Sequence, residues 1–437
     1  MVDILTARDE RIRLIESLLN KDKVIICLRV NYPGQEKVNQ DTITVAKIIH
    51  EEIKKNFQLT NYRYFESLEG PIYLYEVSSD DPIIVKKRTI AIEDNHPLGR
   101  LVDLDVYYQS VKSISRKDLN VSSRKCYLCN EDAFKCIIAQ KHDINEVKNY
   151  FRDKINSFIN VPLDLMELAN QAMLYEVSLE PSFGKVTPST SGAHHDMDYQ
   201  LFLDSISVLS KYMLKFAQLG YQSKPIVAMY EESVELGKAC EKAMFVKTKG
   251  VNTQKGLIFV LGLLVMCSAK VLFEGSDFQK IFTYVEILGK KKFCELDKLN
   301  GDNLTKGEQV YKQYNIGGVR YEASLGFPLI QEALKIINLN DRKSYLKTFL
   351  FLMSKCDDTT IISRKGIDTL NDVKQVMNRL YNSDFNMEEI VRVSDEFVQK
   401  GINPGGSCDL LCGTFFLKLV KNYIDKIKSK EGEKHDE

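Results

Sequence analysis

The chain has 437 residues, of which 44% are hydrophobic and 27% charged, and its 60 basic side chains balance its 60 acidic ones. This length exceeds what one hydrophobic core normally organises, so we expect two or three domains of an ordinary globular protein. The zero net charge argues against a global surface for nucleic acid or another polyanion and leaves room only for local phosphate pockets.

The sequence also argues against export and against a membrane span. The first ten residues already carry several charged side chains, which a signal peptide does not tolerate. The longest apolar run, Leu257 to Ala269, stops at Lys270 and is shorter than the roughly 18 residues that cross a membrane. We therefore expect a cytoplasmic protein whose ten cysteines are reduced, and a buried helix at 257–269.

Residues 1 to about 140 mix helix and strand patterns, which predicts an α+β domain. Apolar residues at helical spacing between Ile12 and Leu19 predict a helix, and Thr6-x-x-Asp9 resembles its capping box. Short apolar runs bounded by charged residues or turns predict strands at 24–28, 72–77, 83–85 and 89–93.

The stretch Gly99–Val106 predicts a further strand with two acidic residues on one face. Asp103 and Asp105 point one way because side chains alternate along a strand, and their apolar neighbours point into the core. Two carboxylates roughly 7 Å apart can hold Mg²⁺ against phosphate oxygens, so both are candidate catalytic and metal-binding residues. The nearby arginines are candidate phosphate ligands, because guanidinium binds phosphate with two hydrogen bonds: Arg100, Arg116 and Arg124. The alternative is a solvated strand face.

Four potential metal ligands follow, spaced Cys126-x₂-Cys129-x₆-Cys136-x₅-His142. A two-residue gap lets two cysteines reach one ion, and zinc accepts three thiolates and one imidazole in a tetrahedron. These residues are therefore candidate ligands of a structural zinc ion. Reduced cysteines without a metal are the alternative, because the other spacings are shorter than in common zinc fingers.

These residues resemble the citrate lyase holo-acyl-carrier-protein synthase family over about residues 5–150. The matching motifs are His96-Pro97-Leu98-Gly99-Arg100-Leu101-Val102-Asp103-Leu104-Asp105-Val106, Ile114-Ser115-Arg116, Arg124-Lys125-Cys126-x-x-Cys129, Asn31-Tyr32-Pro33-Gly34 and Glu69-Gly70-Pro71. The resemblance implies a nucleotidyltransferase-like mixed sheet and metal-assisted attack on an α-phosphate. It also implies transfer of a phosphoribosyl-dephospho-coenzyme A group to a serine of the citrate lyase acyl-carrier (gamma) subunit, with pyrophosphate leaving. Ile137 and Ile138 stand where the family has an arginine.

From Leu163 to Ile427 nearly every segment has helical periodicity, which predicts an all-α domain. Asn160-Val161-Pro162 is the expected joint, because proline disfavours helix in the residue before it. We accordingly expect domains at 1–158 and 163–427 and a charged tail at 428–437. The clearest predicted helices are 197–219, 226–247, 255–274, 320–337, 341–355 and 386–400.

Five polar clusters punctuate this helical half: 192–198, 250–256, 317–323, 357–360 and 403–409. Glycine-rich turns before helices present free N–H groups and the positive end of the helix dipole, which favour phosphate. Acid pairs could hold Mg²⁺ on a triphosphate, and these are Asp196 with Asp198 and Asp357 with Asp358. The candidate phosphate or nucleotide ligands are His194, Lys255, Arg320 and Arg364. The alternative for each cluster is helix capping.

Together the clusters resemble the triphosphoribosyl-dephospho-coenzyme A synthase family over about residues 165–425. The matching motifs are Glu176-Val177-Ser178, Pro181-x-x-Gly184, Gly192-Ala193-His194-x-Asp196-Met197-Asp198, Gly250-Val251-Asn252-Thr253-x-Lys255-Gly256, Arg320-x-Glu322-Ala323, Gly326-Phe327-Pro328 and Pro404-Gly405-Gly406-Ser407-x-Asp409-Leu410-Leu411. The resemblance implies a reaction of ATP with 3'-dephospho-coenzyme A that releases adenine. Such a glycosidic cleavage needs a base for the attacking hydroxyl, and Glu176 and Glu322 are the candidates.

The chain departs from this second family at four positions, which receive no role: Ser182, Phe183, Gln254 and Thr360. The two resemblances predict one bifunctional enzyme that makes the triphosphoribosyl compound and then transfers it. In one alternative the first half is a non-catalytic, zinc-stapled docking module for the carrier. In another the second half is a different ATP-using enzyme, such as a kinase or a nucleoside hydrolase. A malonate decarboxylase carrier is an alternative target of the same chemistry.

Overall fold

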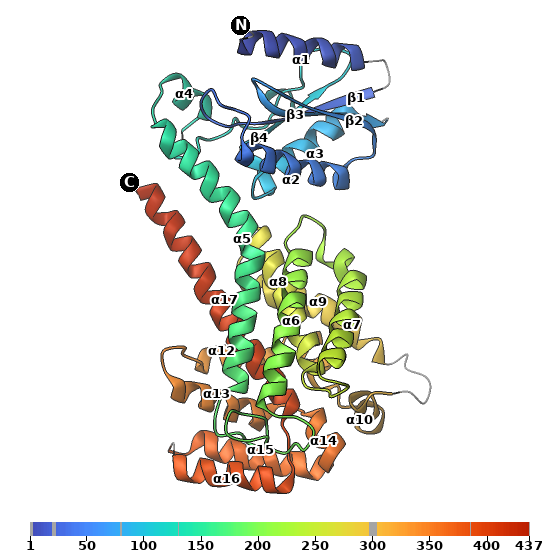
Figure 1. Ribbon diagram of the computed structural model, residues 1–437, viewed down its shortest axis with the longest axis vertical. Coiled ribbons are helices and arrows are strands. Elements are labelled where there is room, and N and C mark those ends of the chain that lie inside the picture. Colours follow the sequence, from blue (N-terminus) through green and yellow to red (C-terminus); the bar gives the residue numbers. More distant parts are fainter. Residues whose placement is uncertain are drawn as a thin grey trace. The chain divides into compact units, whose positions relative to one another are not determined.

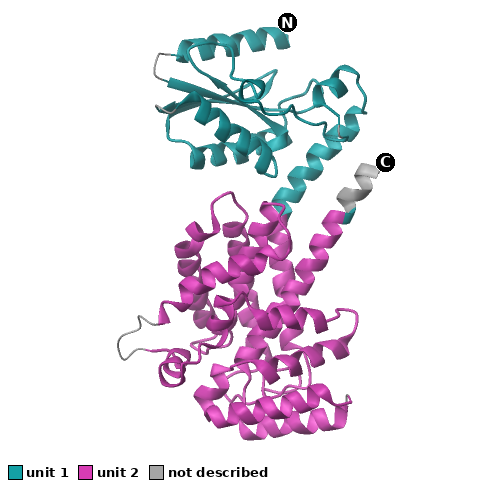
Figure 2. Ribbon diagram, turned by 180° about the vertical axis from the view of Figure 1, so that it is seen from behind, with its two compact units in different colours: residues 1–160, 429–437 teal, residues 161–428 magenta. Residues whose placement is uncertain are grey.

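The structure is a computed structural model that describes residues 3–19, 23–78, 81–129, 131–296, 304–384 and 386–436. It divides into two compact units, residues 1–160 with 429–437 and residues 161–428 (Figure 2). The first unit contains a sheet and helices, and the described part of the second contains helices. The predicted fold class, an α+β region followed by an all-α region, is confirmed.

The first unit is built around a four-stranded sheet with the order β2-β3-β1-β4. The strands are β1 (Lys23–Val30), β2 (Leu59–Ser67), β3 (Gly70–Ser78) and β4 (Val102–Tyr107). All three strand pairings are antiparallel, whereas we expected a mixed sheet. Because β1 lies between β3 and β4, the acidic strand β4 forms one edge, with Asp103 opposite Arg29 and Asp105 opposite Cys27.

Helices cover the two faces of this sheet differently (Figure 1). α2 (Gln40–Asn56) and α3 (Pro82–Asn95) pack on one face, where they share the larger hydrophobic core with alternate residues of β1, β3 and β4. α1 (Ile4–Leu18) packs on the other face through Ile15, against a smaller cluster that includes Ile25 and Leu74. Asp103 and Asp105 lie on the α1 face, because their strand neighbours are buried on the other side.

Two local predictions for this unit are wrong. The segments 83–85 and 89–93, predicted as strands, both lie within α3. Val85, Thr89 and Ile92 are buried at helical spacing, and Asp81 caps the helix by accepting a 2.8 Å hydrogen bond from the Ile83 N–H. A run of β-branched residues therefore favoured strand locally, although its spacing suits a helix. α1 is capped by Asp3, which accepts from the Thr6 N–H, and not by a box beginning at Thr6.

The region between the sheet and the helical unit contains α4 (Ala133–Ile138) and the long α5 (Ile144–Val177). We expected a joint at 160–162, but α5 continues through Pro162. Proline removes one helical hydrogen bond yet its fixed φ is compatible with a helix, so the neighbouring turns carry the helix across this point. The units divide at residue 160, within this helix.

The second unit packs its helices around α8 (Lys255–Phe273). This helix is long and apolar enough to cross a membrane by length and composition, but it is mostly buried in the core of the unit, as predicted for 257–269. The others are α6 (Tyr199–Gly220), α7 (Tyr230–Lys247), α9 (Lys280–Phe293), α10 (Lys306–Tyr314), α11 (Gly318–Ser324), α12 (Pro328–Ile336), α13 (Arg342–Lys355), α14 (Thr359–Lys365), α15 (Ile367–Asn382), α16 (Met387–Lys400) and α17 (Gly405–Asp436).

The predicted charged tail at 428–437 continues α17 as helix to Asp436. Residue 437 and the side chains of 430–436 lie outside the described residues. Each of the five polar clusters precedes or begins a helix, and these helices are α6, α8, α11, α14 and α17.

Candidate active sites

The two acidic residues of β4 turn toward one arginine on the neighbouring strand. Arg29 Nη2 lies 2.9 Å from Asp105 Oδ2 and 3.7 Å from Asp103 Oδ2. The two carboxylates therefore converge on one point. The side chains of Asp103 and Asp105 are 33% and 24% exposed, so a ligand can reach the carboxylates, which are paired with Arg29 in this structure. Carboxylate oxygens that converge at an accessible point suit a hard cation such as Mg²⁺.

A second arginine reaches the same pair from the segment after β4. Arg124 Nη1 donates to Asp103 Oδ1 and to the Val102 carbonyl oxygen, both at 2.8 Å. Its Nη2 also forms an ion pair with the buried Glu93 of α3. Glu93 in turn accepts a 2.7 Å hydrogen bond from the Leu104 N–H, so α3 fixes both the acidic strand and the guanidinium beside it.

The other two predicted phosphate ligands of this unit lie differently. Arg116 donates to Glu93 at 3.0 Å and to Asp94 at 2.7 Å, and is thus held by two acids of α3. Arg100 donates to the Lys125 carbonyl and lies over the ring of Tyr127. Of the three predicted arginines, the structure brings only Arg124 into contact with the acid pair.

The four candidate zinc ligands come together beside this segment. The ligand atoms of Cys126, Cys129, Cys136 and His142 all lie within 4.8 Å of one another. Cys129 Sγ lies 3.5 Å from Cys136 Sγ and 3.3 Å from His142 Nε2. The pKa of Cys129 is lowered to about 7, chiefly by a hydrogen bond from the Glu131 backbone. The geometry of this cluster could therefore hold a metal ion.

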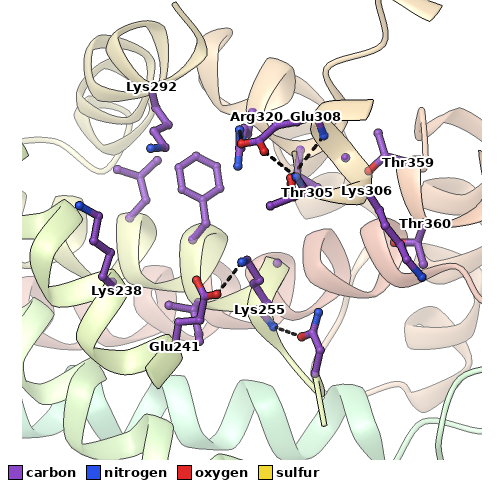
Figure 3. Close-up of a pocket in the computed structure, with 18 of the residues that line it drawn as sticks. Lys238, Glu241, Lys255, Lys292, Thr305, Lys306, Glu308, Arg320, Thr359 and Thr360 are labelled. Atoms are coloured by element: carbon purple, nitrogen blue, oxygen red, sulfur yellow. Dashed lines mark hydrogen bonds and ion pairs between the residues drawn. The ribbon is translucent and has the colours of Figure 1, made fainter. Parts of the chain in front are cut away.

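The helical unit contains a cavity of about 780 Å³, within the size range of pockets for small molecules. Its lining comes from α7, α8, α9, α10, α11 and α14, and Figure 3 shows the polar side chains around it. Six cationic side chains line it: Lys238, Lys255, Lys292, Lys306, Arg320 and Arg364. Such a cavity suits a polyanion of nucleotide size.

Two of these cations are held by acids at the cavity wall (Figure 3). Lys255 Nζ lies 2.5 Å from Glu241, and Arg320 Nη1 lies 3.0 Å from Glu308. Glu308 also forms the capping box of α10 with Thr305, which fixes its position. Lys255 and Arg320 thus line one cavity, as their predicted phosphate role requires.

A smaller cavity of about 170 Å³ adjoins the large one, because Lys255, Gly256, Thr360 and Arg364 line both. Its wall contains two acids and two further polar side chains that are almost fully buried. These residues are Glu176, Asp409, Lys185 and Gln254. His194 also lines it.

Burial changes the protonation of these groups. It raises the pKa of Glu176, although the charge of Lys185, whose Nζ is 3.8 Å from the carboxylate, opposes that shift. It raises the pKa of Asp409 further, with the charges of Asp358 and Glu176 adding to the effect. Burial and the charge of Arg364 lower the pKa of His194, which therefore favours the neutral ring. The small cavity thus combines a strongly proton-retaining acid with a second acid beside a lysine.

The four acids predicted to hold Mg²⁺ in this unit differ in what their side chains contact. Asp198 caps α6 by accepting from the Leu201 N–H, and Asp358 caps α14 and also accepts from Ser407. Both show the capping arrangement that was the alternative. Asp357 pairs with Lys374, while Asp196 lines the large cavity and is exposed.

Glu322, the second candidate base, lies outside the walls of both cavities. It accepts a 3.2 Å hydrogen bond from the Leu329 N–H at the start of α12, and burial raises its pKa. The structure thus places Glu176 and not Glu322 beside the other predicted nucleotide ligands.

Among the residues that the structure brings to the sites, the sequence prediction missed Arg29, Lys185, Lys306 and Asp409. Asp409 and Lys185 stand in or beside motifs that were recognised, so a pattern existed for them. Arg29 follows a run of apolar residues in β1, and an arginine that continues a buried strand is itself informative. Lys306 had no such pattern.

Comparison with known proteins assigns the two halves. Residues 1–158 match the model of the CitX family, described as apo-citrate lyase phosphoribosyl-dephospho-CoA transferase. Residues 162–428 match the model of the CitG family, described as ATP:dephospho-CoA triphosphoribosyl transferase.

Relatives include proteins that match most of the chain and proteins that match a little over half of it. The Protein CitXG of Leuconostoc mesenteroides subsp. cremoris is 32% identical over 90% of this chain and 91% of its own length. The Protein CitXG of Haemophilus influenzae is 28% identical over 96% of each. The 2-(5''-triphosphoribosyl)-3'-dephosphocoenzyme-A synthase of Pectobacterium atrosepticum is 32% identical over 58% of this chain and 88% of its own. The chain therefore belongs to the CitXG family of bifunctional transferases, which join a triphosphoribosyl-dephospho-CoA synthase to an apo-citrate lyase phosphoribosyl-dephospho-CoA transferase.

Proposed function

We propose that each activity has its own site: residues 1–158 transfer the prosthetic group at the acidic face of β4, and residues 163–427 make it in the two adjoining cavities. The proposal rests on one observation: each compact unit contains its own group of polar site residues. The converging carboxylates of Asp103 and Asp105 belong to the first compact unit, and the cation-lined cavity with its buried acids belongs to the second.

Mass balance defines the synthase reaction. A triphosphoribosyl group can leave ATP only if the bond between ribose C1' and the adenine nitrogen breaks. A hydroxyl of dephospho-CoA forms the new bond to C1' and loses its proton, and the departing adenine gains one. The site therefore needs a base on one side of the reacting carbon and an acid on the other.

Two acids of the small cavity fit these roles. Burial raises the pKa of Asp409 well above its ordinary value, which favours the protonated carboxyl that could donate to adenine. Lys185 moderates the pKa shift of Glu176, which suits the acceptor of the hydroxyl proton. Two carboxyl groups whose environments separate their pKa values are the usual arrangement for paired acid and base work.

The triphosphate then lies in the large cavity. Lys255 and Arg364 line both cavities and can bind the phosphate nearest the ribose, and Arg320 and Lys306 stand further into the large one. The cation Mg²⁺, where bound, supplies charge neutralisation on the phosphate chain. Asp196, exposed on the wall, is the residue of the predicted acid pairs that could hold it.

The transfer reaction uses the β4 face. The serine hydroxyl of the acyl-carrier subunit loses its proton to solvent or to the departing pyrophosphate, and its oxygen forms a bond to the phosphorus atom nearest the ribose. The bond from that phosphorus to the outer two phosphates breaks, so pyrophosphate leaves. Asp103 and Asp105 would hold Mg²⁺, which neutralises charge on the phosphate oxygens. Arg29 and Arg124 already contact these carboxylates and are placed to bind phosphate oxygens with their guanidinium forks.

We also propose that the cluster of Cys126, Cys129, Cys136 and His142 holds a structural zinc ion. Three sulfurs and one imidazole within 4.8 Å of one another match the donor set of closed tetrahedral zinc sites. The cluster follows Arg124 directly in the chain, and the Cys126 N–H and Ala133 N–H pair with carbonyls of this segment. Zinc would therefore fix the segment that places Arg124 on Asp103. We further propose that the protein works in the cytoplasm, where its cysteines stay reduced.

The test separates the two reactions in one incubation with ATP, Mg²⁺, dephospho-CoA and the apo acyl-carrier subunit. Adenine is measured by chromatography, and the carrier by intact-mass spectrometry. Asp103→Asn or Asp105→Asn should reduce carrier modification by on the order of 10²–10³-fold while adenine release continues. Asp9→Asn, an exposed acid on α1, is the matched control. Equal loss of both activities in folded protein would refute separate sites.

A further inference from the structure

Gln254 presents a buried amide without a hydrogen-bonding partner. Its side chain is 5% exposed, and both Nε2 and Oε1 lack a partner among the described residues. An unsatisfied buried polar group is costly, and such groups in a native structure call for an explanation. The residue lines the small cavity together with Glu176 and Asp409.

Helix capping does not explain this side chain. Gln254 occupies the N-cap position of α8, but it makes no side-chain hydrogen bond to the helix. The capping contact comes instead from Asn252 Oδ1, which accepts from the Lys255 N–H at 3.1 Å. The backbone N–H of Gln254 itself is directed to the Met244 sulfur. The amide group is therefore left for a ligand.

We infer that the Gln254 side chain binds the edge of the adenine base of ATP in the small cavity and so determines nucleotide specificity. This inference rests on the proposed synthase site. A glutamine amide pairs with adenine through one donor and one acceptor, because the base presents its exocyclic amino group beside a ring nitrogen.

Size and chemistry both support the base, and not the phosphates, at this position. The cavity of about 170 Å³ is close to an engineered cavity of about 150 Å³ that holds one benzene molecule in another protein. The small cavity contains the acids Glu176 and Asp409, and of the six cationic residues of the large cavity only Lys255 and Arg364 also line it, so most of the positive charge available to the phosphates lies in the large cavity. The bond to adenine is also the one that breaks, so the reacting acids and the base must share one space.

Close packing holds this wall in place. A Cβ on Gly256, two residues after Gln254, would lie 2.1 Å from Asp409 Oδ2. The backbone at the start of α8 therefore approaches the Asp409 carboxyl directly. The residue that reads the base and the acid that would protonate it belong to one rigid junction of α8 with α17.

The test compares ATP with purine riboside triphosphate, which lacks the 6-amino group, and uses dephospho-CoA as the second substrate. Base release gives kcat/KM for the full-length wild type, Gln254→Ala and Gln254→Leu. Gln279→Ala, an exposed glutamine of the same unit, is the control. The wild type should prefer ATP by about 5- to 150-fold, and both Gln254 variants should lose most of that preference. Their melting temperature without substrate should equal or exceed that of the wild type.

Four outcomes would overturn the inference. The variants could keep the wild-type preference, they could lose both nucleotides equally, or they could melt well below the wild type, which would indicate a structural amide satisfied by water. A Gln254-dependent effect of removing the amino group from the dephospho-CoA base would assign the residue to the other substrate and also refute it. Failure of the proposed function is distinct, because the wild type would then release no adenine at all.

Discussion

At the scale of single residues, some site residues can be predicted from local periodicity, whereas others come together only through the packing of distant elements. Strand alternation alone predicts that Asp103 and Asp105 share a face, and the structure agrees. Arg29 completes the same constellation, yet it is 76 residues from Asp105 in the chain. No local pattern reports such a contact. Asp409 and Gln254 are likewise brought together only by the approach of α17 to α8.

The buried carboxyl of Asp409 makes stability depend on pH. Because its pKa is raised in the folded state, it contributes stability below the ordinary carboxyl pKa, and that contribution is lost as pH rises toward the raised value. Glu176 and Asp358 act in the same direction, and Lys185 opposes the effect at Glu176. Asp409→Asn should therefore flatten the fall in melting temperature as pH rises above the ordinary carboxyl pKa, by about 2–4 °C for each kcal/mol removed.

Differential scanning calorimetry from acidic to alkaline pH measures this dependence, with adenine release assayed in parallel. The same variant should release adenine at least roughly tenfold more slowly, because the proposed proton donor is lost. A variant with an unchanged pH profile and unchanged adenine release would show that Asp409 has neither of these roles.

Gly256 offers a test of the contact between the start of α8 and Asp409 of α17. A Cβ there would meet Asp409 Oδ2 at 2.1 Å, whereas a Cβ on Gly237 of α7 would meet nothing within 4 Å. Gly256→Ala should displace the carboxyl and lower adenine release by about tenfold or more, by analogy with the cost of misplacing catalytic groups. Gly237→Ala should stabilise the chain by about 0.5–1 kcal/mol. Steady-state kinetics and denaturant unfolding of the two variants check both results, and wild-type adenine release by Gly256→Ala would contradict them.

At the scale of elements, helices with clear amphipathic spacing were predictable and the α3 segment was not. The predicted helices 197–219, 255–274, 341–355 and 386–400 correspond to α6, α8, α13 and α16. In α3 the β-branched residues Ile83, Ile84 and Val85 favour strand by propensity, and tertiary packing against the sheet overrides that preference. Pro162 was expected to end a helix, but α5 continues on both sides of it.

The cysteine segment gives the prediction that belongs to this scale. Cys129→Ala should lose about one bound zinc per chain and most of the carrier transfer, while adenine release by the helical unit continues. Removal of one thiolate leaves only three donors, which a closed structural site does not tolerate. Cys294→Ala, an exposed cysteine outside the cluster, is the control. Metal analysis by mass spectrometry decides the matter, and wild-type protein purified without zinc but fully active in transfer would contradict the proposal.

At the scale of the whole molecule, the chain joins consecutive reactions: the product of the helical unit is the substrate of the sheet unit. The compact units divide at residue 160, and the family matches end at 158 and begin at 162. A shared chain raises the local concentration of the intermediate without requiring a channel. The intact constellation of Asp103, Asp105 and Arg29 argues that the first unit performs chemistry and does more than dock the carrier.

Complementation between two inactive chains tests this separation most directly. Asp105→Asn should be strongly impaired in transfer but make the triphosphoribosyl compound, and Asp409→Asn should be impaired in synthesis but transfer a supplied compound. Each variant is incubated alone and then mixed with ATP, Mg²⁺, dephospho-CoA and the apo acyl-carrier subunit, and the rate of carrier modification is measured by intact-mass spectrometry. We expect slow modification by either chain alone and modification at least roughly tenfold faster by the mixture. A mixture that modifies the carrier no faster than either chain alone, although each folded variant performs its own remaining reaction, would contradict two independent sites.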